Sequence, residues 1–111
     1  MPDPRRNRGD RGEEAAARYL QRLGYKIVAR NYSCRYGEVD LIALDGRTLV
    51  FIEVKLRRGR FDPLEAVDER KQRHLSRVAF DFLRRHAMLG RPARFDVVAV
   101  DGRTMECRHV V

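Results

Sequence analysis

Apolar residues are grouped along this chain in a pattern that predicts five strands and two helices. The two most apolar segments are residues 37–44 and 49–55, which flank Asp45 and Gly46. Both segments are apolar on both faces, as expected of strands at the centre of a sheet that is covered on both sides. The other strands are predicted at residues 25–30, 95–100 and 104–111.

The helices are predicted from apolar residues that recur at helical spacing. The first runs from Asp10 to Leu23 and is followed by Gly24, a residue that commonly ends helices. The second runs from Leu64 to Met88. Their apolar stripes are Ala16, Ala17, Leu20 and Leu23 in the first helix, and Leu75, Val78, Ala79, Phe82 and Leu83 in the second. Residues 31–36 and 57–63 are predicted to be polar connections.

A helix, three strands, a long helix and two strands predict an α/β sandwich around a mixed sheet. Residues 10–111 are interpreted as one domain, and residues 1–9 as a basic, disordered lead-in. We expect a cytoplasmic protein with no membrane partner, because no apolar run is long enough to cross a bilayer or to form a signal peptide. Cys34 and Cys107 have no metal-binding spacing and are expected to be free thiols.

The charge balance is strongly basic. The chain has 24 Lys and Arg against 16 Asp and Glu, which gives a formal net charge of +8. Such a field favours a polyanionic partner, most simply DNA or another nucleic acid. A soluble protein that is merely rich in arginine explains the same numbers, so the charge alone leaves both interpretations open.

The two central strands carry charges at positions that an antiparallel hairpin brings together. With a loop over residues 45–48, Leu44 faces Leu49, and Asp40 then faces Glu53. A tighter turn at Asp45 and Gly46 leaves the two acids on one face as diagonal neighbours. Lys55 points to the same face, two residues beyond Glu53. The same register pairs Leu41 with Ile52, Ala43 with Val50 and Val39 with Val54 on the opposite face.

Charges in apolar strands are costly unless they are paired or bind a metal. Asp40 and Glu53 could together hold a divalent cation, for which oxygen ligands are suited. Lys55 could then orient a water molecule or neutralise a transition state, and Glu13 could add a carboxylate from the first helix. The alternatives are an ion pair between Lys55 and a carboxylate, and a capping box in which Glu13 is the partner of Asp10.

Other polar residues are weaker candidates. Gln72 lies one helical turn before Leu75 and can face inward. His74, His86 and His109 have no ligand spacing and are interpreted as surface or core histidines. The candidate phosphate contacts are Arg57, Arg58 and Arg60 in the loop, and Lys71 and Arg73 on the second helix. An ordinary solvated face is the alternative for these cations.

Several short motifs together resemble a known bacterial family. They are Gly12-Glu13, Gly24-Tyr25, Asn31-Tyr32, residues 37–42, residues 50–55, residues 71–73 and residues 95–100. In combination they resemble the YraN-like family over residues 11–102. That resemblance implies the restriction-endonuclease-like, PD-(D/E)xK three-layer sandwich and a relationship to archaeal Holliday-junction resolvases.

The resemblance also implies roles for individual residues. Asp40, Glu53 and Lys55 stand at the motif positions of the superfamily, and Glu13 stands at its helical acid. Gln72 matches a polar position of the following helix. Glu38 belongs to the pattern of the family itself and is a candidate accessory residue. The chain departs from relatives in two places: no proline precedes Asp40, and Leu56 replaces a small hydroxyl residue.

The leading hypothesis is therefore a Mg²⁺- or Mn²⁺-dependent DNA endonuclease that acts on branched or damaged forms. Resolvase relatives act as dimers, so the resemblance also implies a homodimer. The first alternative is a non-catalytic nucleic-acid-binding protein that retains the nuclease fold. A second is an interaction protein whose charge only maintains solubility. Steep salt dependence of DNA affinity separates these two alternatives.

Overall fold

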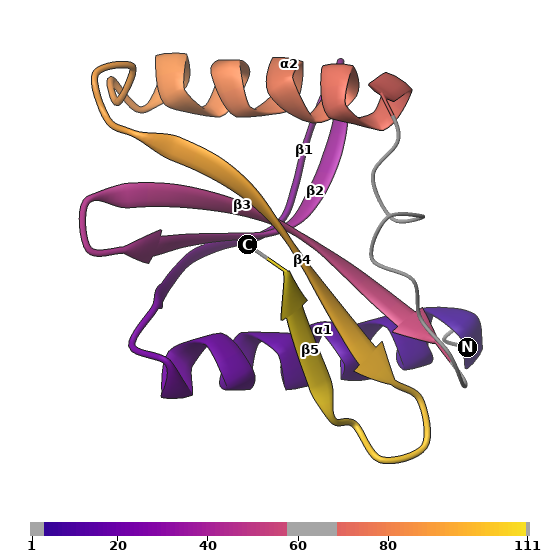
Figure 1. Cartoon of the computed structure of the whole chain (residues 1–111). Helices are drawn as coiled ribbons and strands as arrows, with labels where there is room; N and C mark the ends of the chain where they lie inside the picture. Colours follow the sequence, from indigo (N-terminus) through magenta and orange to yellow (C-terminus); the bar gives the residue numbers. More distant parts are fainter. Residues whose placement is uncertain (1–3, 58–68, 111) are drawn as a thin grey trace.

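One helix covers each face of a five-stranded sheet (Figure 1). The computed structural model describes residues 4–57 and 69–110, and the side chains of residues 11–57 and 73–110. The elements are α1 (Pro4–Arg22), β1 (Lys26–Cys34), β2 (Gly37–Asp45), β3 (Thr48–Arg57), α2 (Glu69–Arg85), β4 (Ala93–Asp101) and β5 (Cys107–Val110). The predicted α/β three-layer sandwich is confirmed, and it is consistent with a restriction-endonuclease-like fold.

The sheet is mixed, as predicted. Its strand order follows the chain from β1 to β5, and every neighbouring pair is antiparallel except β3 and β4. Parallel strands need a crossover connection, and α2 lies within the connection between β3 and β4. This crossover places α2 over the face of the sheet opposite α1 (Figure 1).

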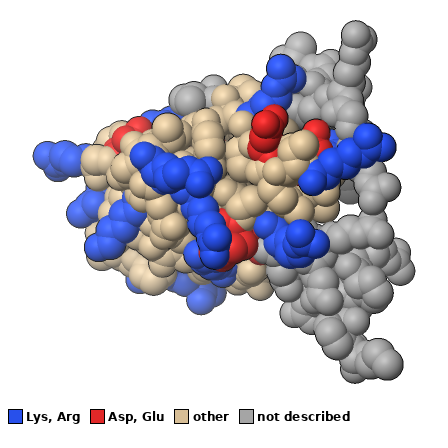
Figure 2. Space-filling view, turned by 90° about the horizontal axis from the view of Figure 1, so that it is seen from below, with Lys and Arg blue, Asp and Glu red and all other residues tan. Residues whose placement is uncertain are grey.

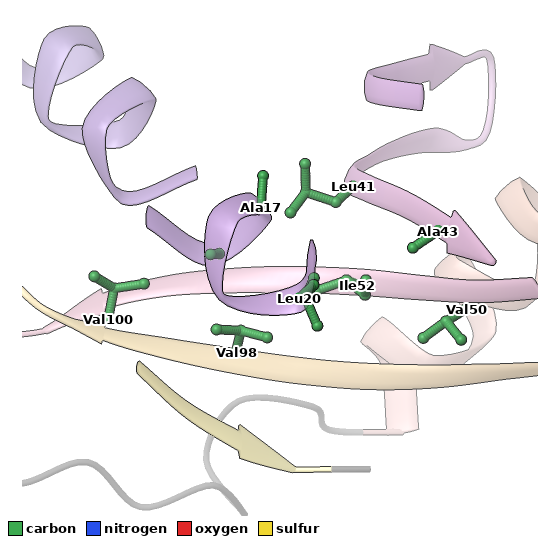
Figure 3. Packing of buried hydrophobic residues seen from close by; sticks show 9 residues of the cluster. Ala17, Leu20, Leu41, Ala43, Val50, Ile52, Val98 and Val100 are labelled. Carbon is green, nitrogen blue, oxygen red and sulfur yellow. The ribbon is translucent and has the colours of Figure 1, made fainter. Parts of the chain in front are cut away.

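Each helix buries its apolar stripe against the sheet. In α1, Ala16, Ala17 and Leu20 are fully buried against residues of β2, β3 and β4 (Figure 3). In α2, the predicted stripe packs on the other face, against Val39, Ile42, Leu49 and Phe51. The sheet residues that contact α1 are Leu41, Ala43, Val50, Ile52, Val98 and Val100.

The ends of the helices differ from the predicted ones. The first helix begins at Pro4, so Asp10 lies inside α1 and cannot cap it, and the capping-box role of Glu13 is wrong. The side chain of Leu23 lies beyond the helix and is 52% exposed, so it does not extend the buried stripe. The second helix ends at Arg85, because Ala87 has a φ of 54° and turns the chain away. Its predicted start at Leu64 lies outside the described residues.

Two strands also differ from the prediction. Residues 31–34 were expected to be a connection, but they continue β1 and pair with residues 37–39 of β2. Tyr32 explains this extension, because its ring packs with the α2 cluster and its hydroxyl donates a hydrogen bond to buried Asp81 over 2.6 Å. The final strand starts at Cys107 because Met105 has a φ of 59° within a turn.

A buried carboxylate on β4 is fully satisfied. The Asp96 side chain is 0% exposed and lies 3.1 Å from Nε of Arg94 and 2.7 Å from Nε2 of His109. Arg94 also donates a hydrogen bond to the Tyr25 hydroxyl and pairs with Asp45. The hydrogen bond to Asp96 is the main cause that raises the pKa of Arg94. His109 is thus a core histidine that joins β5 to β4, and this network has a structural role.

Two further expectations concern the cysteines and the membrane. Cys34 and Cys107 are free thiols, as expected, and they pack against the α2 and α1 clusters respectively. In the part of the chain that the structure describes, neither helix combines the length and the apolar character needed to span a bilayer.

The first prediction compares Leu20 and Leu23, which are about one helical turn apart in the sequence. Leu20→Ala should lower the free energy of unfolding by about 2–5 kcal/mol, because it leaves a cavity in a fully buried cluster. Leu23→Ala should change it by no more than about 0.5 kcal/mol, because this side chain is largely exposed. Urea unfolding followed by circular dichroism measures both. Equal losses for the two variants would contradict the packing of α1.

Candidate functional site

The hairpin of β2 and β3 follows the predicted register over most of its length. Leu44 lies opposite Leu49, and the pairing continues to Leu41 opposite Ile52. The next predicted pair, Asp40 opposite Glu53, is not part of the ladder. Instead, Oδ2 of Asp40 accepts a hydrogen bond of 2.7 Å from the backbone N–H of Val54. Just past the end of the ladder, the carboxylate of Asp40 therefore takes the hydrogen bond of a backbone N–H group of β3.

The alternation of faces along β2 changes at the same place. Val39 was predicted to share a face with Leu41, but Val39 packs in the α2 cluster and Leu41 in the α1 cluster. On the neighbouring strand, Asn31 lies across from Asp40, between the pairs formed by its two neighbours, and has a φ of 51°. Asparagine tolerates this left-handed backbone better than most residues. Both strands are thus irregular at the level of Asp40.

A cavity of about 310 Å³ opens at this irregularity, between the sheet and α2. Glu38 and Asp40 of β2 and Glu53 of β3 line it from the sheet, and His74 lines it from α2. Asp40 and Glu53 therefore face the same space although their backbones do not pair. The structure brings these two candidate residues together, with Glu38 beside them.

The acids of the cavity act on one another. Burial raises the pKa of Asp40 above its ordinary value, and the negative charges of Glu53 and Glu38 raise it further. The hydrogen bond from Val54 and the positive charge of Lys55 act in the opposite direction. The balance disfavours a negative charge on Asp40, and an additional cation near the carboxylates would relieve the repulsion.

Lys55 pairs directly with one of these acids. Its Nζ lies 2.9 Å from Oε1 of Glu53, and the two side chains are only 25% and 12% exposed. The ion pair that the sequence left open as an alternative is therefore present. It also holds a cation beside the two carboxylates, which is the arrangement that the site hypothesis requires.

The predicted third carboxylate lies in another layer. Glu13 belongs to α1, whose neighbouring Gly12 lies against Leu56 of β3 on the face opposite the cavity. Glu13 is partly buried and is not part of the cavity lining. Across residues 11–57 and 73–110, the acidic, histidine and cysteine side chains form no group of three or more that could hold a metal ion.

The two carboxylates nevertheless suit one kind of metal. Mg²⁺ binds oxygen ligands and commonly uses one or two carboxylates, because it retains several water molecules. Asp40 and Glu53 provide these donors at one cavity. Mn²⁺ is suited to the same carboxylate and water ligands. The chemistry of the donor set therefore fits Mg²⁺ or Mn²⁺.

The structure describes only some of the remaining residues that were predicted to belong to the site. Arg57, at the end of β3, and Arg73, in the first half of α2, are both exposed. Arg58 and Arg60 lie outside the described residues, as do the side chains of Lys71 and Gln72.

Two residues that line the cavity, His74 and Tyr36, were not assigned to the site from the sequence. His74 lies one helical turn before Val78 of the apolar stripe, and this spacing could have placed it at the edge of the buried face. Tyr36 also lines the cavity, from the turn between β1 and β2. Its position directly before Gly37 was the available signal, but the predicted connection at residues 31–36 concealed that it follows a strand.

Net charge does not by itself mark a binding face. Figure 2 views the molecule from the α1 side, where lysine and arginine side chains are spread around several acidic ones. Glu14 of α1 pairs with Arg18 over 3.1 Å and with Arg30 over 2.6 Å. These pairs neutralise part of the positive charge, so the cavity is the more specific indication of function.

Comparison with known proteins identifies relatives along most of the chain. The family model described as "Uncharacterised protein family UPF0102" matches residues 12–100. UPF0102 protein GSU0650 of Geobacter sulfurreducens is 54% identical over 94 residues, which cover 83% of this chain and 73% of the relative. UPF0102 protein STH1475 of Symbiobacterium thermophilum is 53% identical over 106 residues, which cover 90% of this chain and 89% of the relative.

A third relative matches a similar part of the chain. The UPF0102 protein of Thermotoga petrophila is 47% identical over 88 residues, covering 79% of this chain and 81% of that protein. The names of these relatives state no activity. The extent and identity of the matches show that this chain belongs to the UPF0102 family.

Proposed function

We propose that this protein is a Mg²⁺- or Mn²⁺-dependent nuclease that hydrolyses phosphodiester bonds of DNA at the cavity between β2, β3 and α2. The observation that carries the proposal is the meeting of Asp40 and Glu53 at one cavity, with Lys55 paired to Glu53. Burial and neighbouring negative charges raise the pKa of Asp40, and a pKa shifted by such causes beside a cavity is typical of functional sites.

Asp40 and Glu53 would hold the divalent cation. When bound, such a cation polarises a phosphoryl oxygen and lowers the pKa of a bound water molecule. The hydrogen bond from Val54 fixes one oxygen of Asp40, so this carboxylate is oriented before any ligand arrives. Burial, and then the charges of Glu53 and Glu38, raise the pKa of Asp40, so a proton would compete with the metal cation for this carboxylate and the metal affinity would rise with pH.

Lys55 would act on the phosphate rather than on the metal. Its ammonium group is held beside the carboxylates by the ion pair with Glu53, and most of its side chain is shielded from solvent. A cation in this position stabilises negative charge that develops on phosphoryl oxygens, and it can also orient the attacking water. Stabilisation of this kind is stronger in a partly buried site than in water.

The other members of the site are part of the proposal in the roles that the resemblance implies. Glu13 of α1 does not line the cavity, so its proposed carboxylate would have to reach the metal from outside this lining. Gln72 would supply a polar group from α2, and Glu38 an accessory acid at the cavity. The proposed phosphate contacts are Arg57, Arg58, Arg60, Lys71 and Arg73. DNA with branches and a homodimeric assembly are further parts of the proposal, both taken from the resolvase relatives.

The second candidate function is nucleic-acid binding without hydrolysis. The observation that favours it is the ion pair itself, because Lys55 already neutralises one of the two carboxylates. A protein of this kind would retain the fold, the acids and the basic surface but would release DNA unchanged. Its affinity for DNA would fall steeply with salt concentration.

The second prediction separates these functions by testing cleavage. With Mn²⁺, the protein should cut at least one of three DNA forms, linear, nicked or four-way, and EDTA should abolish cutting. Asp40→Asn and Lys55→Ala should each reduce the rate by at least about 100-fold while DNA binding is retained. Glu106→Gln, an exposed acid in the turn before β5, is the matched control and should behave as the parent. Gel assays and fluorescence anisotropy measure cleavage and binding.

Two outcomes would reject the nuclease. Cleavage that survives both Asp40→Asn and Lys55→Ala would come from a contaminating enzyme. Salt-sensitive binding of all three DNA forms, with no cleavage in Mg²⁺ or Mn²⁺, would establish the binding protein instead.

The third prediction concerns the stability of the metal-free protein. Because burial and like charges raise the pKa of Asp40, the folded state binds more protons than the unfolded state just above the ordinary aspartate value of about 3.9. The free energy of unfolding therefore falls as the pH rises through this window. Asp40→Asn removes the ionising group but keeps an oxygen that can accept the hydrogen bond from Val54.

This variant should therefore be more stable than the parent at neutral pH in EDTA. Its advantage should shrink as the pH approaches about 4, where Asp40 is also neutral in the parent. Urea unfolding at several pH values measures the difference. A difference that is independent of pH would show that Asp40 is not destabilised by its surroundings.

A further inference from the structure

A second hollow adjoins the acid cavity. Its volume is about 280 Å³, and its lining includes Tyr36 together with Arg77 and Phe80 of α2. Tyr36 also lines the acid cavity, so the two hollows meet at this residue. A ligand that enters the acid cavity can therefore extend past the tyrosine ring onto the outer surface of α2.

Phe80 is unusual among the apolar residues of this protein. Its side chain is 56% exposed, the largest exposed fraction among the large apolar residues that the structure describes. It lies on α2 between buried Val78 and Phe82, on the side that faces away from the sheet. Within the described part of the chain, Phe80 stacks on no other ring, whereas Phe82 contacts Tyr32, Phe51 and His86. The ring of Phe80 is therefore accessible to a ligand.

The charges around this hollow would suit phosphate groups. Arg77 lines it, and Arg73 lies one turn earlier on α2. Neither forms an ion pair with another described residue, whereas Arg84 and Arg85 near the end of α2 are both held by Asp81. Arg35 lies 4.8 Å from the centre of the Tyr36 ring, so a third guanidinium is close to the hollow.

The exposed ring of Phe80 and the half-buried ring of Tyr36 lie beside Arg73 and Arg77, which form no ion pair with described residues. Aromatic rings beside such arginines are the groups that bind single-stranded nucleic acids. Aromatic side chains stack on bases of any sequence, and arginines contact the phosphates of the same strand. In a duplex the faces of the bases are covered by their neighbours, so side chains can stack only on bases that are unpaired or splayed out. The arrangement therefore favours an unpaired strand over a continuous duplex.

We propose that Tyr36 and Phe80 form a stacking platform for an unpaired nucleobase whose strand continues into the acid cavity. The substrate class is then a nucleic acid with a single-stranded segment next to the phosphate that is cut. This inference rests on the proposed function, because the acid cavity is taken as the place where the phosphate is bound. It adds the strand form that the site selects.

The fourth prediction tests stacking without relying on cleavage. The probe is a single-stranded oligonucleotide that contains 2-aminopurine, whose fluorescence falls when the base stacks on an aromatic ring. In EDTA, the parent protein should quench this fluorescence. Phe80→Leu should abolish most of the quenching and weaken affinity for the single strand about tenfold, with little change for a duplex of the same sequence. Tyr36→Leu should act in the same direction.

A matched control comes from another exposed residue. Leu89 is 53% exposed, close to the value for Phe80, and lies beyond the end of α2. Leu89→Ala should leave both the quenching and the affinities unchanged. Circular dichroism of all variants confirms that they fold, which is expected for exposed side chains.

Several results would overturn the stacking platform. One is quenching of the 2-aminopurine fluorescence that persists in both aromatic variants. Another is an equal loss of affinity for the single strand and the duplex. A third is a change in the sedimentation of Phe80→Leu while its DNA affinity is unchanged. The last result would instead identify the hollow as a contact between protein chains. The two proposals fail separately: quenching that depends on Phe80 without any metal-dependent cleavage rejects only the nuclease. Cleavage that depends on Asp40 but is unaffected by Phe80→Leu and Tyr36→Leu rejects only the platform.

Discussion

The hydrogen bond between the Val54 N–H and the carboxylate of Asp40 is the contact on which the site depends. It replaces a backbone contact just past the last regular pair of β2 and β3. The irregularity lets Val39 pack under α2 while Leu41 packs under α1. It also leaves Asp40 and Glu53 at one cavity, where burial and the charge of Glu53 both disfavour the ionised form of Asp40. This unfavourable arrangement persists because well-packed apolar clusters on both faces of the sheet hold the strands in place.

A buried and a partly buried carboxylate of this protein illustrate how structural and functional charges differ. Asp96 is fully buried, yet two cationic or hydrogen-bonding partners satisfy it, and it faces no cavity of the proposed site. Asp40 is less buried, but it has acidic neighbours and lies against open space. Buried charges with complete partners hold elements together, whereas incompletely compensated charges beside a cavity can bind a ligand. The distinction depends on the neighbours of each carboxylate and not on burial alone.

Much of the fold could be predicted from local patterns. The apolar runs at residues 37–44 and 49–55 and the loop between them were sufficient for the central register, because one-residue shifts would expose a buried face. The stripe from Leu75 to Leu83 identified the buried side of α2 in the same way. The extension of β1 was not predicted, although residues 31–34 alternate polar and apolar side chains as a half-buried strand does. It forms a strand because the Tyr32 ring and hydroxyl find partners on α2.

Residue spacing and apolar periodicity were enough to predict which acids form the site, their place on two central strands and the class of fold. The tertiary structure alone decided that Asp40 bonds to the backbone instead of facing Glu53 across a regular ladder. It also decided that His74 and Tyr36 complete the cavity and that Tyr36 adjoins the exposed Phe80. The physical reason is that these contacts join segments far apart in the chain, whose approach is set by the packing of α2 on the sheet and not by local preference.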